Sequence, residues 1–358
     1  MAAETSRSLA VLLRPAPLPR RPPRAGGLMW QVIYALLPAA GLGLYVYGAP
    51  ALLVLASCLA GALAGEGLGL LLWRRGRPLL DGSALLSGLL LALTLPPGLS
   101  PGWAFLGGAA GLLLGRQLLG GLGLNLLNPA LCGRLVIALA APTALQGAWL
   151  KPFWWREGGW FAAAPTVADP WPLVRETHQL LRRLTQGEMP ALPASWPAGE
   201  RLDLIRHAQD LLAAVDSGQL FWPRLPGLLG EASLLALLPG LIWLFTARLV
   251  DWRIPAAALL VLVAALLAAP GEAAGLGLDL ALPLRGCGLL LLLCVFASDP
   301  VTTPLGQSAK LCFGLMVAAG CLLVLLAGGS TSGLFWVVLA AGLATPWLDR
   351  LLLPRGPR

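Results

Sequence analysis

Charged residues are scarce in this chain, and long apolar stretches separate them. Lys and Arg number 25 and Asp and Glu 17 among 358 residues, so 12% of the chain is charged, and the mean hydropathy is +0.77. A soluble domain carries about a quarter charged residues, so this composition excludes an ordinary soluble enzyme. It also excludes a disordered chain, which would be rich in charge and poor in apolar residues. The sequence therefore predicts an all-α integral membrane protein.

Ten apolar stretches predict about ten transmembrane segments, which makes the chain a polytopic membrane protein. A complete crossing takes about 20 residues, and two of the stretches, 83–95 and 286–298, are too short for one. The ten stretches are 28–47, 50–73, 83–95, 103–119, 130–142, 231–247, 255–269, 286–298, 311–328 and 334–352.

The positions of the basic residues predict the orientation in the membrane. The polar stretch 143–230 holds eight basic and eight acidic residues, so the net charge of +8 belongs to the apolar remainder. With a cytoplasmic N-terminus and ten crossings, all the basic residues of that remainder except Arg285 fall on the cytoplasmic side. Arg116 and Arg134 are included in this count. Such a bias is typical of cytoplasmic loops, and it argues against a nucleic-acid-binding face.

The resulting organisation has two membrane regions around one exported loop. We expect a cytoplasmic tail at 1–27, a first repeat at 28–142, a periplasmic loop at 143–230, a second repeat at 231–353 and a cytoplasmic end at 354–358. Since five crossings precede the loop and five follow it, the two repeats run in opposite directions.

The third segment of each repeat is the short one, and Gly and Pro interrupt both. The first runs from Asp81 to the Pro96-Pro97 turn, and the second from Arg285 to Pro304. Short, interrupted segments at corresponding positions predict inverted repeats with broken helices, whose free backbone groups need partners inside the membrane. A site is therefore expected where the two breaks approach each other. Two ordinary proline-kinked helices are the alternative interpretation.

Polar residues next to these breaks are candidate ligand contacts. Thr94 precedes the Pro-Pro turn, Asp299 begins an Asp-Pro-Val-Thr-Thr-Pro turn, and Asn125 and Asn128 follow the fourth segment. Amides, hydroxyls and a carboxylate can bind a polar heterocycle such as a flavin ring, or line an ion path. Asn128 before Pro129 also fits a helix N-cap, and the two roles are compatible.

Glu66 is the one carboxylate expected in mid-span, between Gly65 and Gly67. An acid inside the membrane is costly, so its presence predicts an ion or proton relay. The alternative is a carboxyl group that reaches water or stays protonated. No metal or iron–sulfur site is expected, because the six cysteines form no C-x-x-C pair and His178 and His207 lack metal-ligand spacing.

Several stretches carry a resemblance to a known family. They include Asp81-Gly-Ser-Ala-Leu-Leu-Ser-Gly, Asn125-Leu-Leu-Asn-Pro, Gly230-Glu-Ala-Ser, Asp251-Trp-Arg-Ile-Pro, Ser298-Asp-Pro-Val-Thr-Thr-Pro and Pro346-Trp-Leu-Asp-Arg. Taken in order, they resemble the D subunits of the Rnf ion-translocating oxidoreductase (electron transport) complex. More remotely, they resemble the NqrB subunit of sodium-pumping NADH:quinone reductase.

The resemblance implies a membrane subunit that couples electron transfer between ferredoxin-type donors and NAD to ion translocation, without catalytic residues of a stand-alone enzyme. It implies the bacterial inner membrane and the A, B, C, E and G subunits of Rnf as partners. It also implies a non-covalent flavin, riboflavin or FMN, at Thr94, Asn125, Asn128 and Asp299, and an ion pathway at Glu66. A solute channel or transporter with inverted repeats, or a structural subunit that has lost its flavin, are the alternatives.

The loop departs from the family at the covalent FMN position. The family usually attaches FMN to a Thr in a Ser-x-Ala-Thr-Pro-Leu motif, whereas the nearest stretch here reads Ala168-Asp-Pro-Trp171-Pro-Leu. Since an indole has no hydroxyl to form a phosphoester, we expect covalent FMN to be absent. Thr166 is the fallback acceptor, and Thr177 is the other nearby hydroxyl.

Overall fold

The regular structure of this computed structural model is helical. The structure describes residues 25–73, 81–118, 127–152, 160, 166, 222, 226–268, 287–327 and 331–352, and no strand occurs among them. The predicted all-α class is therefore confirmed for this part of the chain. Four helices are long and apolar enough to cross a membrane, which makes the chain a polytopic membrane protein. They span Gly26–Tyr47, Ala49–Leu72, Gln307–Leu326 and Gly333–Leu352.

The helices form two groups along the sequence. The first group comprises α2 (Ala25–Tyr47), α3 (Ala49–Trp73), α4 (Ser83–Leu93), α5 (Pro101–Leu112) with its π-helical continuation η1 (Leu113–Gln117), α6 (Pro129–Ala140) and α7 (Pro142–Gln146). The second comprises the 3₁₀ turn η5 (Leu229–Glu231), α10 (Leu234–Thr246), α11 (Arg253–Leu267), α13 (Cys287–Leu291) with the π turn η7 (Leu292–Phe296), α14 (Gln307–Leu326) and α15 (Thr331–Leu352).

Each of the ten predicted apolar stretches contains a helix, but more of the helices are short than the sequence indicated. Besides the two third segments, α6, α10 and α11 have only 12, 13 and 15 residues. Pro142 ends α6, because proline lacks the N–H that would continue the helix and disfavours helical backbone at Ala141. Ser233 caps α10 at its start, and Arg248 leaves the helix with φ of 55°.

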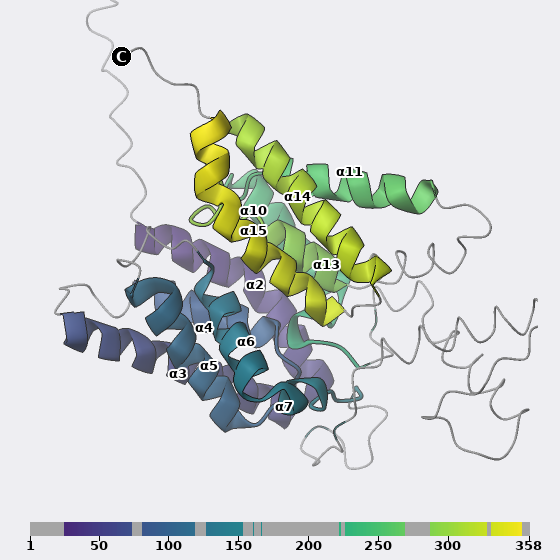
Figure 1. The fold of residues 1–358 in the computed structure, drawn as a ribbon. Helices are drawn as coiled ribbons and strands as arrows, with labels where there is room; N and C mark the ends of the chain where they lie inside the picture. Colours follow the sequence, from purple (N-terminus) through teal and green to yellow (C-terminus); the bar gives the residue numbers. More distant parts are fainter. Residues whose placement is uncertain are drawn as a thin grey trace, which may run out of the picture.

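Corresponding helices pack in the same pairs in both groups. The second and fourth helices contact each other, as α3 with α5 and as α11 with α14, and so do the fourth and fifth, as α5 with α6 and as α14 with α15. Between the groups, α2 packs on α10 and α6 touches α15. In Figure 1 the first group (purple to teal) lies against the second (green to yellow), with α2 at the boundary.

Glycines at every fourth residue bring α3 and α5 into close contact. A methyl group added at Gly61 would overlap the Phe105 carbonyl oxygen, and one at Gly65 would lie 2.5 Å from that of Ala109. Small residues spaced by four let the backbones of membrane helices approach, so dispersion contacts between them become dense. The α3–α5 contact therefore depends on these missing side chains.

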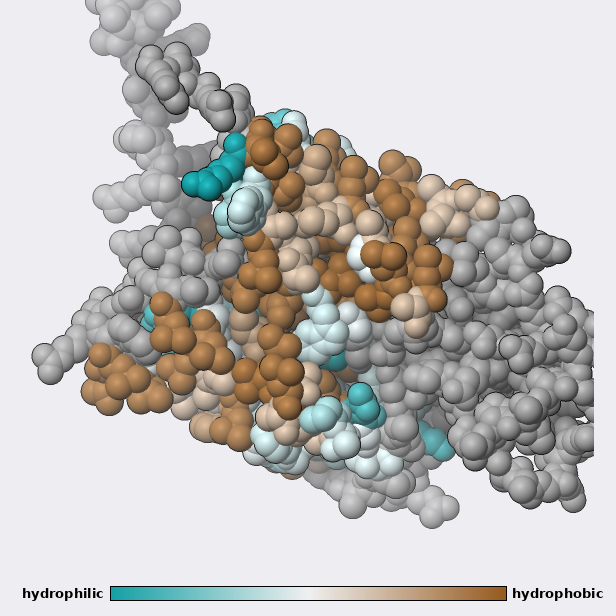
Figure 2. Space-filling view, viewed as in Figure 1, coloured by the Kyte–Doolittle hydropathy of each residue, from teal (hydrophilic) through white to brown (hydrophobic). Residues whose placement is uncertain are grey.

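The outer surface of the described helices is largely apolar. Large hydrophobic side chains such as Leu71, Leu139 and Leu267 are each more than 70% exposed, and Figure 2 shows hydrophobic residues covering much of the helical surface in that view. A soluble monomer rarely exposes a continuous apolar surface of this extent. Lipid tails or neighbouring membrane helices are the environment that fits it.

Gly61→Ala should loosen the α3–α5 contact. A methyl group cannot fit against the Phe105 carbonyl, so the helices must separate, at a cost of about 1–3 kcal/mol. The matched control is Gly67→Ala on the same helix, because no atom lies within 4 Å of a methyl group at Gly67. Thermal unfolding in detergent should show a lower midpoint for Gly61→Ala alone; equal midpoints would contradict this packing.

Candidate functional site

The two broken segments both pack on the turn η5, α4 from the first group and α13 from the second. Helix α4 stops at Thr94, and the Leu229 N–H donates to the Leu95 carbonyl just beyond it, at 3.2 Å. On the other side, a methyl group at Gly230 would lie 2.7 Å from Leu291 of α13 and 2.8 Å from the Leu93 carbonyl. Because Gly230 has no side chain, both short helices can lie close to its backbone.

Asn128 and Asp299 join the two groups of helices through a side-chain hydrogen bond. The Asn128 Nδ2 donates to Asp299 Oδ2 at 2.9 Å, across 171 residues of sequence. The other end of the Asn128 amide caps α6, since its Oδ1 accepts from the Ala130 N–H at 3.0 Å. The structure therefore shows the N-cap role predicted for Asn128, while the other end of its amide meets Asp299.

The turn that carries Asp299 is held by its own hydrogen bonds. Asp299 Oδ1 accepts from the Val301 N–H at 3.1 Å, and the Ser298 hydroxyl donates to the Leu293 carbonyl at 2.8 Å. Thr345 of α15 donates to the Thr302 carbonyl at 2.9 Å. These bonds satisfy backbone groups that the end of η7 leaves without helical partners, as a membrane interior requires.

Thr94 and Asn125 are not brought to this contact by any described interaction. Thr94 is fully buried, but its hydroxyl donates to the Leu91 carbonyl of its own helix at 2.8 Å. Asn125 lies outside the described residues.

The Asn128–Asp299 contact has the chemistry for the polar edge of a flavin, since an amide and a carboxylate can meet its imide N–H and carbonyl groups. The room beside it is small. The crevice against Asn128 measures about 10 Å³, and its other described walls are Leu127, Leu131, Thr302, Val338, Leu339 and Gly342. This volume suits one water molecule. The hydrogen-bonding groups suit the edge of a flavin ring, but the described residues leave room for only about one water molecule and do not enclose the ring system itself.

Thr166, the fallback acceptor for covalent FMN, lies next to the turn that follows α4. Its methyl carbon would be 3.0 Å from a methyl group at Gly98, and the residue is exposed. Trp171, at the usual acceptor position, lies outside the described residues. Nearby, Trp149 is 1% exposed, and its indole N–H has no hydrogen-bond acceptor among the described residues.

Glu66 belongs to a separate buried polar cluster between α3, α4 and η1. Its Oε1 accepts from the Arg116 guanidinium at 3.0 Å, and its Oε2 from the Gln117 amide at 2.8 Å. Arg116 also donates to the Ser83 hydroxyl at 2.7 Å. A π turn holds more residues than an α turn, so the angle between consecutive side chains around the helix axis is smaller. The neighbours Arg116 and Gln117 can therefore both reach Glu66.

Two basic residues counted as loop charges are instead buried in the structure. Arg116 is 1% exposed and Arg134 is fully buried. The Arg134 guanidinium lies over the ring of Phe335, 4.9 Å from its centroid, and near that of Trp336. Both arginines lie within otherwise apolar segments. This position alone indicated burial, because a charge inside the membrane usually pairs with another group of the protein. Sequence reasoning missed both sets of partners.

A second carboxylate–base contact joins Asp251, which precedes α11, to the first turn of α14. Asp251 accepts from Lys310 of α14 at 2.8 Å and from the Arg253 N–H at 3.1 Å. Burial raises the pKa of Asp251, but these bonds and the two positive charges outweigh it and hold the pKa below its ordinary value. This pair tethers two helices of the second group.

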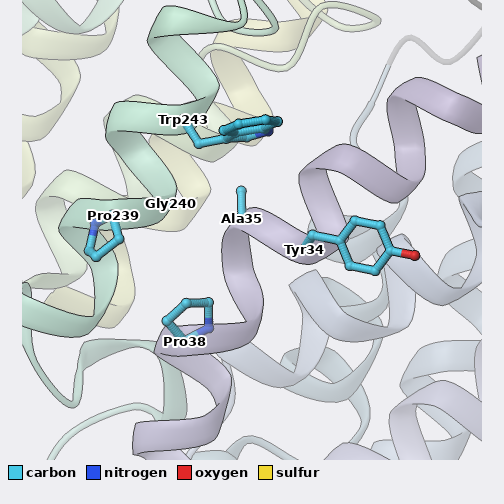
Figure 3. Close-up of a pocket in the computed structure, with 6 residues that line it drawn as sticks. All are labelled: Tyr34, Ala35, Pro38, Pro239, Gly240 and Trp243. Carbon is cyan, nitrogen blue, oxygen red and sulfur yellow. The ribbon is translucent and has the colours of Figure 1, made fainter.

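An apolar groove lies where α2 crosses α10 (Figure 3). Its volume is about 310 Å³, at the lower end of the range for ligand sites. The chemistry of its walls suits a lipid chain or a neighbouring helix rather than a polar ring. The lining residues are Tyr34, Ala35, Pro38, Pro239, Gly240 and Trp243.

Comparison with known proteins gives one family. A sequence profile described as the NQR2, RnfD, RnfE family matches residues 13–356. The D subunit of the ion-translocating oxidoreductase complex of Stutzerimonas stutzeri is 36% identical over 344 residues, which cover 92% of this chain and 90% of that protein.

Two further relatives differ in the ion that their names state. The D subunit of the proton-translocating ferredoxin:NAD(+) oxidoreductase complex of Clostridium ljungdahlii is 27% identical, over 91% of this chain and 90% of that protein. The D subunit of the Na(+)-translocating ferredoxin:NAD(+) oxidoreductase complex of Acetobacterium woodii is 28% identical, over 92% of this chain and 89% of that protein.

Breaking the Glu66–Arg116 pair should cost more stability than replacing it. Glu66→Leu leaves a buried guanidinium without its nearest carboxylate, which costs about 3–5 kcal/mol, whereas Glu66→Leu with Arg116→Met removes both charges. Denaturant unfolding in detergent should rank the double variant above Glu66→Leu in stability. The opposite ranking would show that the two charges are not paired in the folded protein.

Proposed function

The chain belongs to the NQR2, RnfD, RnfE family, as a D subunit of the Rnf type, and we propose that it carries electrons and ions across a bacterial inner membrane. The relatives are named as subunits of ion-translocating oxidoreductase complexes. The A, B, C, E and G subunits of such a complex are the proposed partners. Family membership favours this role over the solute channel or transporter.

The proposed architecture is two inverted repeats of five crossings, with both ends in the cytoplasm and residues 143–230 in the periplasm. Matching packing pairs, α3–α5 with α11–α14 and α5–α6 with α14–α15, support the repeats. The basic residues that flank the helices support the orientation, and burial of Arg116 and Arg134 removes only two of them from the flanking set.

The observation that carries the functional proposal is the Asn128–Asp299 hydrogen bond. It joins the amide at the N-terminus of α6 to the carboxylate in the turn after η7, and a polar ligand here could share their hydrogen bonds. We propose that this contact meets the edge of a non-covalent riboflavin or FMN, and that Thr94 and Asn125, which no described interaction brings to it, are further contacts of the same flavin. Such a flavin supplies one- and two-electron transfer when bound.

The residues present would act by orienting and hydrogen-bonding this flavin. Asn128 is fixed at the N-terminus of α6 by its capping bond, so its amide N–H₂ points at the junction. Asp299 is fixed by the Val301 N–H, which leaves its other oxygen for Asn128 or a ring N–H. Glu66, in its own cluster, is the proposed ion-pathway carboxylate.

Asp299→Asn should lower the flavin content of the purified complex. The carboxylate can accept a charge-assisted hydrogen bond worth about 1.5–3 kcal/mol, so its loss predicts roughly tenfold weaker retention. The measurement is visible absorbance per complex. Asp349→Asn is the matched control, because Asp349 also accepts backbone N–H bonds, from Leu305 at 2.9 Å and from Gly306 at 3.5 Å, and neither Asn128 nor Asp299 is among these partners.

A complex whose wild-type subunit shows no flavin absorbance would favour the structural subunit that has lost its flavin. Equal flavin content in Asp299→Asn and Asp349→Asn would remove Asp299 from the site.

Covalent FMN should be absent from this subunit, because Trp171 stands at the acceptor position. A denaturing gel viewed under ultraviolet light should show no fluorescence in the band of this 37.3 kDa chain. A fluorescent band that disappears in Thr166→Ala or Thr177→Ala would identify that hydroxyl as the acceptor and overturn this expectation.

A further inference from the structure

The cluster around Glu66 contains a second carboxylate that faces the same guanidinium. Arg116 Nη2 lies 3.0 Å from Glu66 Oε1 and 4.0 Å from Asp81 Oδ2. Among the described residues of this cluster, one guanidinium therefore lies between two carboxylates. The two nitrogen–oxygen distances differ by only 1.0 Å, so a small rotation of the Arg116 side chain can exchange one carboxylate partner for the other.

Asp81 is built to receive the guanidinium. Its Oδ1 accepts from the Ser83 N–H at 2.9 Å and from the Ser83 hydroxyl, which leaves Oδ2 directed toward Arg116. The Ser83 hydroxyl already accepts from Arg116 Nη1 at 2.7 Å. This bond can hold one end of the guanidinium while the other end moves.

The two carboxylates differ in their access to the surface. The Glu66 side chain is 2% exposed and that of Asp81 is 17% exposed. Asp81 comes directly after residues 74–80, which carry three arginines, at the proposed cytoplasmic margin. The order Asp81, Arg116, Glu66 thus leads from that margin to a buried carboxylate.

In the arrangement described, both oxygens of Glu66 already accept hydrogen bonds. Arg116 occupies Oε1 and the Gln117 amide occupies Oε2. A buried carboxylate keeps its charge only while a positive partner or hydrogen bonds compensate its desolvation. A cation that binds Glu66 would therefore compete with Arg116 for the same negative charge.

We propose that Arg116 is a tethered cation that moves between Glu66 and Asp81, and that its departure from Glu66 opens this carboxylate to the translocated monovalent cation. This inference rests on the proposed ion pathway at Glu66 and adds its gate, the Arg116 side chain, which opens and closes Glu66 to the ion. Because two positive charges repel each other, a cation at Glu66 favours Arg116 at Asp81, and Arg116 at Glu66 excludes the cation. Binding and release of the ion are thereby linked to one side-chain movement.

Asp81→Asn tests the gate without breaking the Glu66–Arg116 pair. The amide keeps the shape of the side chain and its turn with Ser83, but it no longer attracts the guanidinium. The complete complex, reconstituted in lipid vesicles, is supplied with its electron donor and acceptor. Tracer sodium uptake and internal pH are recorded at increasing sodium concentrations.

The expected result is that Asp81→Asn raises the cation concentration for half-maximal transport by roughly tenfold or abolishes transport, while flavin absorbance stays at the wild-type level. The matched control is Asp251→Asn. Like Asp81, Asp251 stands just before a helix, accepts a hydrogen bond from the backbone N–H two residues later, and lies close to a basic side chain. This control should transport like the wild type.

Two outcomes separate the gate from the function on which it rests. If the wild-type complex moves neither sodium nor protons during electron transfer, the ion pathway fails and the gate with it. If the wild type transports and Asp81→Asn shows the same cation dependence, the gate alone is wrong. A structure of the complex at high sodium should show Arg116 Nη2 closer to Asp81 than to Glu66; an unchanged order of distances would also overturn the proposal.

Discussion

Inside a bilayer no water is available to complete a hydrogen bond, so the polar groups of the membrane-spanning helices must find their partners within the protein or its complex. This constraint explains why the described residues are helical. It also explains how three of the short helices end, since a specific hydrogen bond completes backbone groups at each of these ends. Asn128 caps α6, the Ser298 hydroxyl binds the Leu293 carbonyl, and Leu229 binds the Leu95 carbonyl.

The same constraint makes the few polar side chains informative. Asn128 and Asp299 meet across the two helix groups, and Glu66 meets Arg116 and Gln117 within the first group. The first contact lies between the N-terminus of α6 and the turn after η7, where we propose the edge of a redox ring. The second is a charge cluster that leads toward the surface through Asp81. We therefore propose that electron carriage and ion passage occupy different places in one subunit.

The sequence predicted the helices well, because the length and hydropathy of an apolar stretch depend on local residues alone. It also selected Asn128 and Asp299, since polar residues beside Gly and Pro breaks stand out in an apolar chain. It did not identify the partner of Glu66, because Arg116 is fifty residues away and a one-dimensional pattern contains no distance between them. Arg116 and Arg134 were counted as flanking charges for the same reason. The sequence also did not predict how short α6, α10 and α11 are, because their ends depend on local caps and on Pro142, and the hydropathy of a stretch contains no information on these.

The central claim is that two groups of five crossings run in opposite directions and so bring their broken helices together. The most direct measurement is to place one epitope tag at the N-terminus, one at the C-terminus and one within residues 143–230, and to test their access to antibody in sealed inside-out and right-side-out vesicles. The account predicts both ends on the cytoplasmic face and the loop on the other. Ends on opposite faces would mean an odd number of crossings and would contradict the inverted pair.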